Sequence, residues 1–244
     1  MFGLFKKKDT FAPLIVDMHC HLLPNVDDGS SSPEETVRSL KAMYTVGYRK
    51  VFLTPHFQAR YPNIEDDIKK RFEVLKKAIA KSGEKNLPEV VDIAGEYRFD
   101  PLFARMPGVD KVLTLPGKTL LCEFSLHNNG YMPIDIFSDY IKMGYKLILA
   151  HPERYPYLNA HSTEVKKMRE MGVAFQVNIL SLNGFYGESA KRKGFEYIEK
   201  GLSEYLGTDT HNMRYIAALL ETAENKEVQR VLKNYNFKNA ELIK

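Results

Sequence analysis

The sequence predicts an α/β domain whose parallel strands close into a barrel, and three observations lead to this prediction. Short apolar runs that barely alternate in polarity recur along the chain, as strands covered on both faces do. Helical patterns lie between these runs, and no Pro/Gly/Ser-rich linker or internal repeat divides the chain. Ionisable residues stand at the ends of six of the seven runs, which is how a barrel builds the face that carries its active site.

The seven strands are expected where β-branched and other apolar residues concentrate, over 14–18, 50–54, 90–94, 119–123, 146–150, 173–178 and 205–208. The clearest helix should run from Ser32 to Val46, because Ser32 can cap it and Pro33 suits the first helical position. Glu35 would complete a capping box, and Gly47 would end the helix. Further helices are expected over 63–81, 134–143 and 163–171, and from about 213 and 225.

The alternative to a barrel is an open doubly wound sheet, which commonly binds nucleotides through a glycine-rich loop. The chain has neither GxGxxG nor GxxxxGK[ST], so that alternative has no support from a phosphate-binding motif. A length of 244 residues suits one barrel domain. We therefore expect a single domain over residues 1–244, with 1–12 as a flexible N-terminal extension.

Composition excludes several classes of protein. With 44% hydrophobic and 27% charged residues the chain is typical of soluble globular domains, and its net charge of +4 is far below that of nucleic-acid binders. It lacks an apolar run of about 18 residues for stable membrane insertion, and its first residues lack the apolar core of a signal peptide. The two cysteines form no CxxC motif or disulfide framework, so a cytoplasmic location is expected.

The residues that follow the predicted strands are mainly histidines and carboxylates. They are His19, His21, His56, Glu96, Glu123, His151, Asp209 and His211, and the carboxylate pair Asp27-Asp28 lies a few residues beyond the first two. Charged groups at the ends of buried strands are costly unless they are paired or bound to a cation, so one converging metal site explains the pattern best. Each glutamate could instead pair with a nearby arginine such as Arg98 or Arg105. The two remaining histidines, His127 and His161, are expected in solvated loops.

Strand geometry separates the first two histidines from the cysteine between them. Residues i and i+2 of a strand point to one face, so His19 and His21 should face the site while Cys20 faces away. Cysteine phosphatases use a CxxxxxR loop, but the sixth residue after Cys20 is valine and the sixth after Cys122 is asparagine. Both thiols are therefore expected to pack in the core.

In combination, the runs HxHLLPxVDDG from His19, TPH from Thr54 and AHPERY from Ala150 resemble those of the polymerase-and-histidinol-phosphatase (PHP) superfamily of metal-dependent phosphoesterases. Within it they are similar to the CpsB/YwqE type of bacterial protein-tyrosine phosphatase. The resemblance extends over about residues 16–212 and implies a distorted seven-stranded (β/α)7 TIM-like barrel.

The same resemblance implies a three-metal site. One metal would be held by His19, His21, Glu96 and Asp209, a second by Glu96, Glu123 and His151, and a third by Asp28, His56 and His211. Asp27 would be a neighbour of the site rather than a ligand. It favours Mn²⁺, although imidazole and carboxylate ligands also suit Fe, Zn and Mg. Phe57 stands where many members have another histidine.

Four arginines are candidates for binding the phosphorylated substrate. Arg154 matches a phosphate-binding arginine of the family, and Arg214 is the nearest candidate for a second one, although it follows the last histidine more closely than the family pattern does. Arg60 and Arg98 follow predicted ligands and are expected near the mouth of the site, where basic groups would attract a phosphopeptide. Both also suit plain solvated loops.

The resemblance implies hydrolysis of phosphotyrosine by a metal-activated hydroxide, with the tail of a bacterial tyrosine kinase that controls capsular or exopolysaccharide synthesis as the partner. A small-molecule phosphomonoesterase of the histidinol-phosphatase type would share nearly all these ligands. A TatD-like nuclease also begins with His-x-His but lacks the full pattern of two strand-end glutamates and a final Asp-x-His. A non-catalytic metal-binding or partner-docking protein is the remaining alternative.

Overall fold

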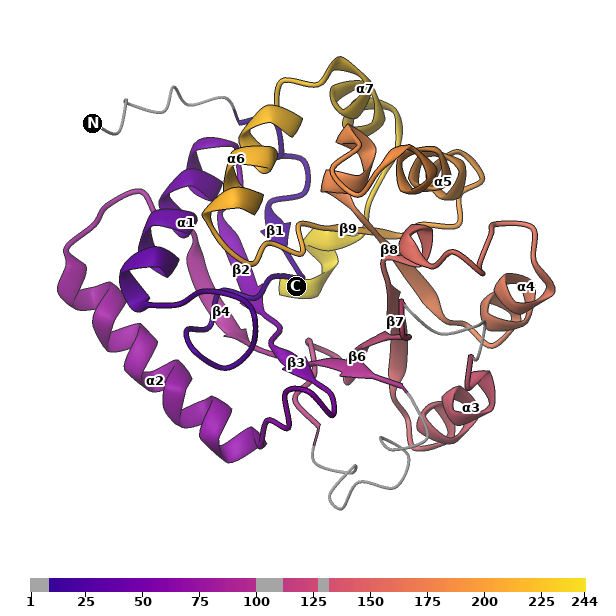
Figure 1. Cartoon of the computed structure of the whole chain (residues 1–244), viewed down its shortest axis with the longest axis horizontal. Helices are drawn as coiled ribbons and strands as arrows, with labels where there is room; N and C mark the ends of the chain where they lie inside the picture. Colours follow the sequence, from indigo (N-terminus) through magenta and orange to yellow (C-terminus); the bar gives the residue numbers. More distant parts are fainter. Residues whose placement is uncertain (1–8, 100–111, 127–131) are drawn as a thin grey trace.

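The strands of the protein form two parallel sheets in a computed structural model that describes residues 9–99, 112–126 and 132–244 (Figure 1). The first sheet has the order β1-β2-β4, and the second has the order β3-β5-β6-β7-β8-β9. Their bounds are β1 Val16–Asp17, β2 Lys50–Leu53, β3 His56–Phe57, β4 Glu89–Ile93, β5 Glu96–Arg98, β6 Thr119–Glu123, β7 Lys146–Ala150, β8 Ala174–Asn178 and β9 Tyr205–Gly207. The predicted α/β class with parallel strands is confirmed, and each predicted strand range overlaps an observed strand.

Two of the predicted strands continue beyond a break into the second sheet. Between β2 and β3 lies Pro55, which has no N–H to donate to a neighbouring strand. Between β4 and β5 lies Gly95, where a Cβ atom would come within 2.5 Å of the Tyr97 ring. Directly after these breaks His56 and Glu96 pair in register, so the change of sheet brings two predicted ligands side by side.

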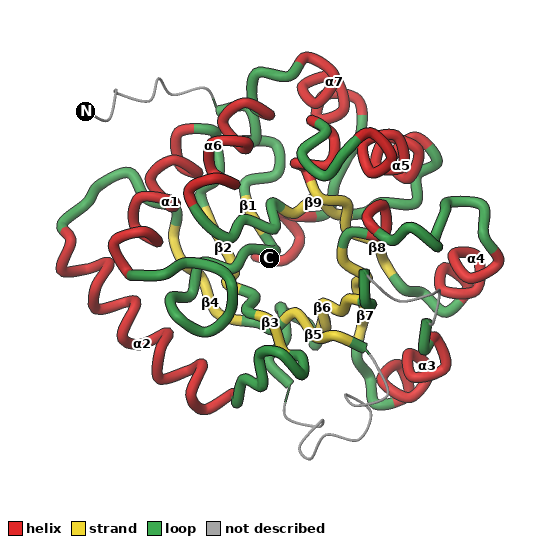
Figure 2. Tube along the Cα trace, viewed as in Figure 1, coloured by secondary structure: helices red, strands yellow, loops and turns green. Residues whose placement is uncertain are grey.

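The strands surround a common interior, and the α-helices lie outside them (Figure 2). The C-terminal 3-10 helix Asn239–Ile243 instead contributes Leu242 to the smaller core cluster with strand residues such as Ile148. A parallel bridge between Cys20 and Thr210 joins the segments that follow β1 and β9. Alternate residues of one strand serve different parts of the core: Leu120 packs in a large cluster with residues of the helices, whereas Leu121 packs in a smaller cluster with Ile148. Because successive side chains of a strand point to opposite faces, alternate residues at the strand ends can direct polar side chains into the interior.

The helices are α1 Pro33–Thr45, α2 Glu65–Ser82, α3 Ile134–Lys142, α4 Thr163–Glu170, α5 Glu188–Glu199, α6 Met213–Thr222 and α7 Lys226–Asn234. Ser32 caps α1 as predicted, accepting a hydrogen bond from the Glu35 N–H at 3.2 Å. The predicted capping box is wrong, because the Glu35 carboxylate accepts from the N–H and hydroxyl of Ser31 instead. Helix α5 was not predicted: it has no side-chain cap, and a buried lysine, Lys193, interrupts its apolar face.

The start of the described chain is packed rather than extended. Phe11 is fully buried, donates its N–H to the Val46 carbonyl at 2.7 Å and lies against the Tyr48 ring. The flexible extension expected over 1–12 is therefore wrong for residues 9–12, because this aromatic side chain fills the core. Residues 1–8 lie outside the described part of the chain. Among the described residues, no helix is long and apolar enough to cross a membrane.

Candidate metal centre

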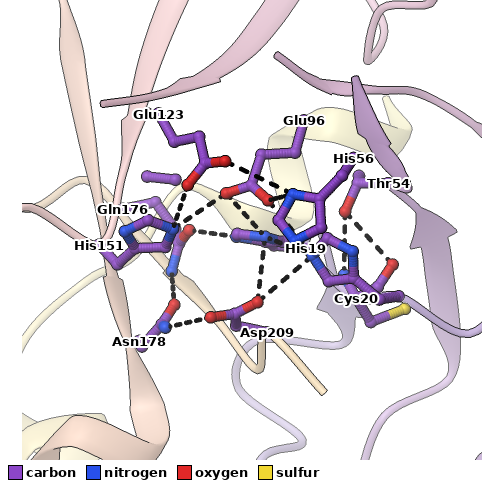
Figure 3. A network of polar contacts seen from close by, with 12 residues as sticks. His19, Cys20, Thr54, His56, Glu96, Glu123, His151, Gln176, Asn178 and Asp209 are labelled. Atoms are coloured by element: carbon purple, nitrogen blue, oxygen red, sulfur yellow. Dashed lines mark hydrogen bonds and ion pairs between the residues drawn. The ribbon is translucent and has the colours of Figure 1, made fainter. Parts of the chain in front are cut away.

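The predicted ligand side chains converge from the strand ends into one buried cluster (Figure 3). Eight of the nine fall into four groups whose ligand atoms lie within 4.8 Å of one another. These groups are His19–His21–Glu96, His19–His151–Asp209, His56–Glu96–Glu123 and His21–His56–His211. The ninth, Asp28, is the exposed member, with 49% of its side chain accessible.

Facing nitrogens mark the centre of the cluster. The Nε2 atoms of His19 and His21 are 3.2 Å apart. Glu96 Oε1 lies 3.3 Å from the His19 nitrogen, and Glu96 Oε2 lies 3.3 Å from the His21 nitrogen. Asp209 Oδ1 lies 3.4 Å from the first nitrogen and 3.3 Å from the second. Donor atoms of four side chains from three strand ends thus surround one point, as ligands of a cation do.

Two further groups of side chains flank this centre. On one side, His151 Nε2 lies 2.9 Å from Glu96 Oε1 and 3.8 Å from Glu123 Oε2. On the other side, Asp28 Oδ1 lies 3.6 Å from His56 Nε2 and 3.8 Å from His211 Nε2. The structure thus brings together every residue of the three predicted ligand sets.

The backbone at two of these residues is unusual. His151 has φ 38° and Asp209 has φ 52°, both in the left-handed region that residues with a Cβ atom rarely adopt. Each such residue costs about 1–3 kcal/mol and tends to occur at functional sites, where the surrounding structure holds it. The strain therefore falls on two residues that face the cluster.

Burial and mutual attraction shift the pKa values of the cluster in opposite directions. Burial lowers the pKa of His19, but attraction to Glu96 and Asp209 outweighs it and raises this pKa to about 9. Burial raises the pKa of Glu96, but the nearby His19 and His56 hold it well below its usual range. His211 has its pKa lowered to about 4 by burial and by the charge of His21. The pKa of Asp209 is likewise held well below its usual range by the nearby His19, so Glu96 and Asp209 are ionised and attract positive charge, whereas burial raises the pKa of Glu123.

The donor atoms fit a bound cation better than a closed hydrogen-bond network. Glu96 Oε2 and His56 Nδ1 are buried and 2.9 Å apart, yet neither makes a hydrogen bond. A buried polar atom without a partner costs about 1–3 kcal/mol, which a cation bound between such atoms would recover. Imidazole nitrogens and carboxylate oxygens without a thiolate suit divalent Mn, Fe, Zn or Mg.

The four predicted arginines differ in their surroundings. Arg154 donates to Asp209 Oδ2 at 2.7 Å, and its guanidinium lies 4.1 Å from the Tyr186 ring centroid. Arg98 donates to Glu123 Oε1 at 3.0 and 3.2 Å, so it pairs with a predicted ligand, as one of our alternatives held. Arg105 lies outside the described residues.

The other two arginines are exposed, and the guanidinium of each lies over an aromatic ring. Arg60 lies over Tyr61, whose ring is in turn nearly parallel to that of His56. Arg214 lies over Phe185, 5.3 Å from its ring centroid. The structure therefore brings Arg154, but not Arg214, into contact with the ligand cluster.

Both thiols point away from the cluster, as the strand geometry predicted. In Figure 3 the sulfur of Cys20 points away from the cluster, and this thiol donates to the Phe52 carbonyl at 3.3 Å. The Cys122 thiol donates to the Ile148 carbonyl, also at 3.3 Å. Burial raises the pKa of both thiols well above the usual value. They are therefore poor nucleophiles. His161 is an exposed loop residue, as predicted, whereas His127 lies outside the described residues.

Several polar residues that were not predicted as ligands support the ligand side chains. Asp27, expected only as a neighbour, accepts from His21 Nδ1 at 2.9 Å and from the His56 N–H at 3.0 Å. Asp17 accepts from the Thr208 hydroxyl at 2.6 Å, and burial raises its pKa to about 6. The sequence signal that could have identified Asp17 and Asp27 is their position beside the ligand motifs.

A family model described as "Capsular polysaccharide synthesis, CpsB/CapC" matches residues 15–242. The chain belongs to the CpsB/CapC family. The chain is similar to the tyrosine-protein phosphatase YwqE of Bacillus subtilis, to which it is 25% identical over 207 residues, covering 82% of this chain and 78% of YwqE. The tyrosine-protein phosphatase CpsB of Streptococcus pneumoniae is 27% identical over 217 residues, covering 82% of this chain and 84% of CpsB.

Solved structures resemble this CpsB/CapC family member in fold. A crystal structure from work on B. subtilis YwqE and S. pneumoniae CpsB, described as unique metal-dependent tyrosine phosphatases, aligns with a TM-score of 0.74 at 24% identity. The alignment covers 91% of this chain and 96% of that one. The phosphotriesterase homology protein of Escherichia coli, solved with phosphate in its active site, aligns with a TM-score of 0.53 at 11% identity over 93% of this chain and 94% of that one.

Proposed function

We propose that this protein is a metal-dependent protein-tyrosine phosphatase. The observation that carries the proposal is the buried cluster of facing imidazole nitrogens and carboxylate oxygens with Arg154 at its edge. Family membership supports the same activity, because the relatives YwqE and CpsB are named tyrosine-protein phosphatases. The substrate would be a phosphotyrosine side chain of another protein.

We also infer that the two sheets form a single domain, a distorted seven-stranded TIM-like barrel of the PHP type. The bridge between Cys20 and Thr210 supports closure of the barrel, because it links the segments that follow the first and last strands. Counting β2 with β3 and β4 with β5 as continuous strands gives the seven strands of such a barrel.

The proposed ligand sets are those implied by the family resemblance. His19, His21, Glu96 and Asp209 would hold one metal; Glu96, Glu123 and His151 a second; and Asp28, His56 and His211 a third. We propose Mn²⁺ as the metal, with Fe, Zn or Mg as alternatives that the same ligands would accept.

Divalent cations, when bound, would lower the pKa of a water molecule toward neutrality and neutralise charge on the phosphoryl oxygens. The chain's own contribution begins with Arg154, whose planar guanidinium can bind two phosphoryl oxygens at once. Asp209 and the ring of Tyr186 hold this guanidinium at the edge of the cluster. The exposed Arg60 would attract an anionic peptide, and Arg98 and Arg214 remain further candidates for contacts with the substrate.

A tyrosyl oxygen with a pKa of about 10 leaves more readily than a seryl alkoxide, so less help from a general acid is needed. We propose the phosphorylated tail of a bacterial tyrosine kinase in capsule or exopolysaccharide synthesis as the partner, on the strength of the family description. The two buried free thiols are compatible with a reducing compartment, and we propose the cytoplasm.

The test is hydrolysis of a phosphotyrosine peptide by metal-stripped protein, with and without added Mn²⁺. Activity should depend on the metal, persist in Cys20→Ser and fall by about 100-fold or more in His21→Ala, since the loss of even an outer residue that orients a ligand costs about 10- to 100-fold. Loss of activity in Cys20→Ser with His21→Ala unharmed would overturn the proposal. Hydrolysis of histidinol phosphate with none of the peptide would favour the small-molecule phosphomonoesterase.

A further inference from the structure

One strand ends at the cluster without contributing a histidine or a carboxylate. Strand β8 instead presents two amides, Gln176 and Asn178, which point to the same face because they are two residues apart. Both are fully buried, whereas the alternate residues Phe175 and Val177 pack in the outer core. A buried amide is shielded from water and needs hydrogen-bond partners within the protein. Gln176 and Asn178 bond to each other and to two predicted ligands.

The two amides link His19 to Asp209 through three short hydrogen bonds (Figure 3). Asn178 Nδ2 lies 2.7 Å from Asp209 Oδ2, and Gln176 Nε2 lies 2.8 Å from Asn178 Oδ1. Gln176 Oε1 then lies 2.7 Å from His19 Nδ1. All four side chains are buried, so water does not compete for these bonds.

The direction of the chain follows from its carboxylate end. An ionised carboxylate only accepts hydrogen bonds, so Asn178 must turn its NH₂ group toward Asp209 and its oxygen toward Gln176. Gln176 must then donate its own NH₂ to Asn178 and turn its oxygen toward His19. Nδ1 of His19 is therefore the protonated nitrogen, and Nε2 is the one that faces the other ligands.

We propose that Gln176 and Asn178 are positioning residues that fix the tautomer of His19 and the orientation of Asp209 for metal binding. This inference rests on the proposed metal site. Two features of the backbone support the pair. Glu153 accepts from the N–H of Asn178 at 3.0 Å, and Gly207 makes room for the contact with His19. A Cβ atom at Gly207 would lie 2.8 Å from both Gln176 Nε2 and the Cβ of His19.

The experiment measures the Kd of metal-stripped protein for Mn²⁺ by isothermal titration calorimetry. Gln176→Met and Asn178→Leu remove the hydrogen bonds at similar volume, and Asn178→Asp keeps the shape but faces a carboxylate with another carboxylate. Each should raise the Kd by about 10- to 100-fold, the usual effect of losing a residue that orients a ligand. Asn239→Leu is the matched control, because Asn239 is a buried amide that bonds only to backbone groups.

The control should lower the Tm but leave the Kd within about twofold of wild type, because Asn239 contacts no predicted ligand. Folded Gln176 and Asn178 variants that bind Mn²⁺ as wild type does would refute this inference alone. Equal losses of affinity in Asn239→Leu would also refute it, since the role would then be only structural. A wild-type protein that binds no Mn²⁺ would refute the proposed function together with the inference.

A measurement on the wild type covers the case in which the variants do not fold. Ring ¹⁵N spectra of the protein loaded with diamagnetic Zn²⁺ report which nitrogen of each histidine carries a proton. The expected result is a protonated Nδ1 and a metal-bound Nε2 for His19. Binding of the metal through Nδ1 would overturn the inference.

Discussion

Replacing Lys193 by methionine should destabilise the protein strongly although this lysine touches no predicted ligand. Lys193 lies on α5 and is only 8% exposed. Its ammonium donates to the carbonyls of Tyr155 and Leu158, each at 2.7 Å, and to that of Pro156 at 3.4 Å. It thereby holds the segment that directly follows Arg154.

The size of the effect follows from these contacts. A hydrogen bond from a charged donor contributes about 1.5–3 kcal/mol, so the two short bonds together contribute about 3–6 kcal/mol. Removing the ammonium also removes the cost of burying it, a cost that already lowers the pKa of Lys193. We expect a net loss of about 3 kcal/mol in the free energy of unfolding, near the upper end of ordinary substitutions.

Differential scanning calorimetry measures this loss as a decrease in Tm of about 6–12 °C, at 2–4 °C per kcal/mol for a chain of this size. The control is Lys191→Met on the same helix, where the lysine forms a partly exposed ion pair with Glu227 at 2.9 Å. Such pairs contribute about 0–1 kcal/mol, so its Tm should change little. A Tm for Lys193→Met within about 2 °C of wild type, or an equal loss in Lys191→Met, contradicts the reasoning.

Three other outcomes are expected. Added Mn²⁺ at 100 times its Kd should stabilise metal-stripped protein by about 2.7 kcal/mol, and a Tm that does not move contradicts the metal site. Arg154→Lys should lower kcat/KM for a phosphotyrosine peptide about 10- to 100-fold because the guanidinium fork is lost, whereas Arg214→Lys should stay within about threefold in the same assay. Gly29→Ala should lower both Tm and activity, because its Cβ would collide with the His21 carbonyl; a soluble, fully active variant would contradict this.

Much of the fold and the candidate site could be predicted because the relevant signals are local. The period of two along a strand put His19 and His21 on one face and Cys20 on the other, and the structure confirms this arrangement. The cost of burying charge indicated that strand-end histidines and carboxylates would meet. Helix α5 was not predicted because its buried face carries Lys193 and Gly194, which interrupt the apolar pattern of an amphipathic helix.

The partners of each polar group were beyond prediction because they come from distant parts of the chain. Arg98 was a candidate for the substrate or for Glu123, and only the folded chain shows that it pairs with Glu123. Gln176 carried no signal of its own, since an amide in a strand suits many roles. It meets His19 across 157 positions of sequence.

The sequence by itself determined the parallel α/β class, the residues that face the interior and the chemical type of the cluster. These follow from periodicity and desolvation, which act residue by residue. Only the tertiary structure decided which donor meets which acceptor, that Arg154 rather than Arg214 contacts Asp209, and that β8 joins two ligands through amides. A change of a few tenths of an ångström in the donor–acceptor distance can make or break a hydrogen bond, and the packing of the whole chain sets that distance.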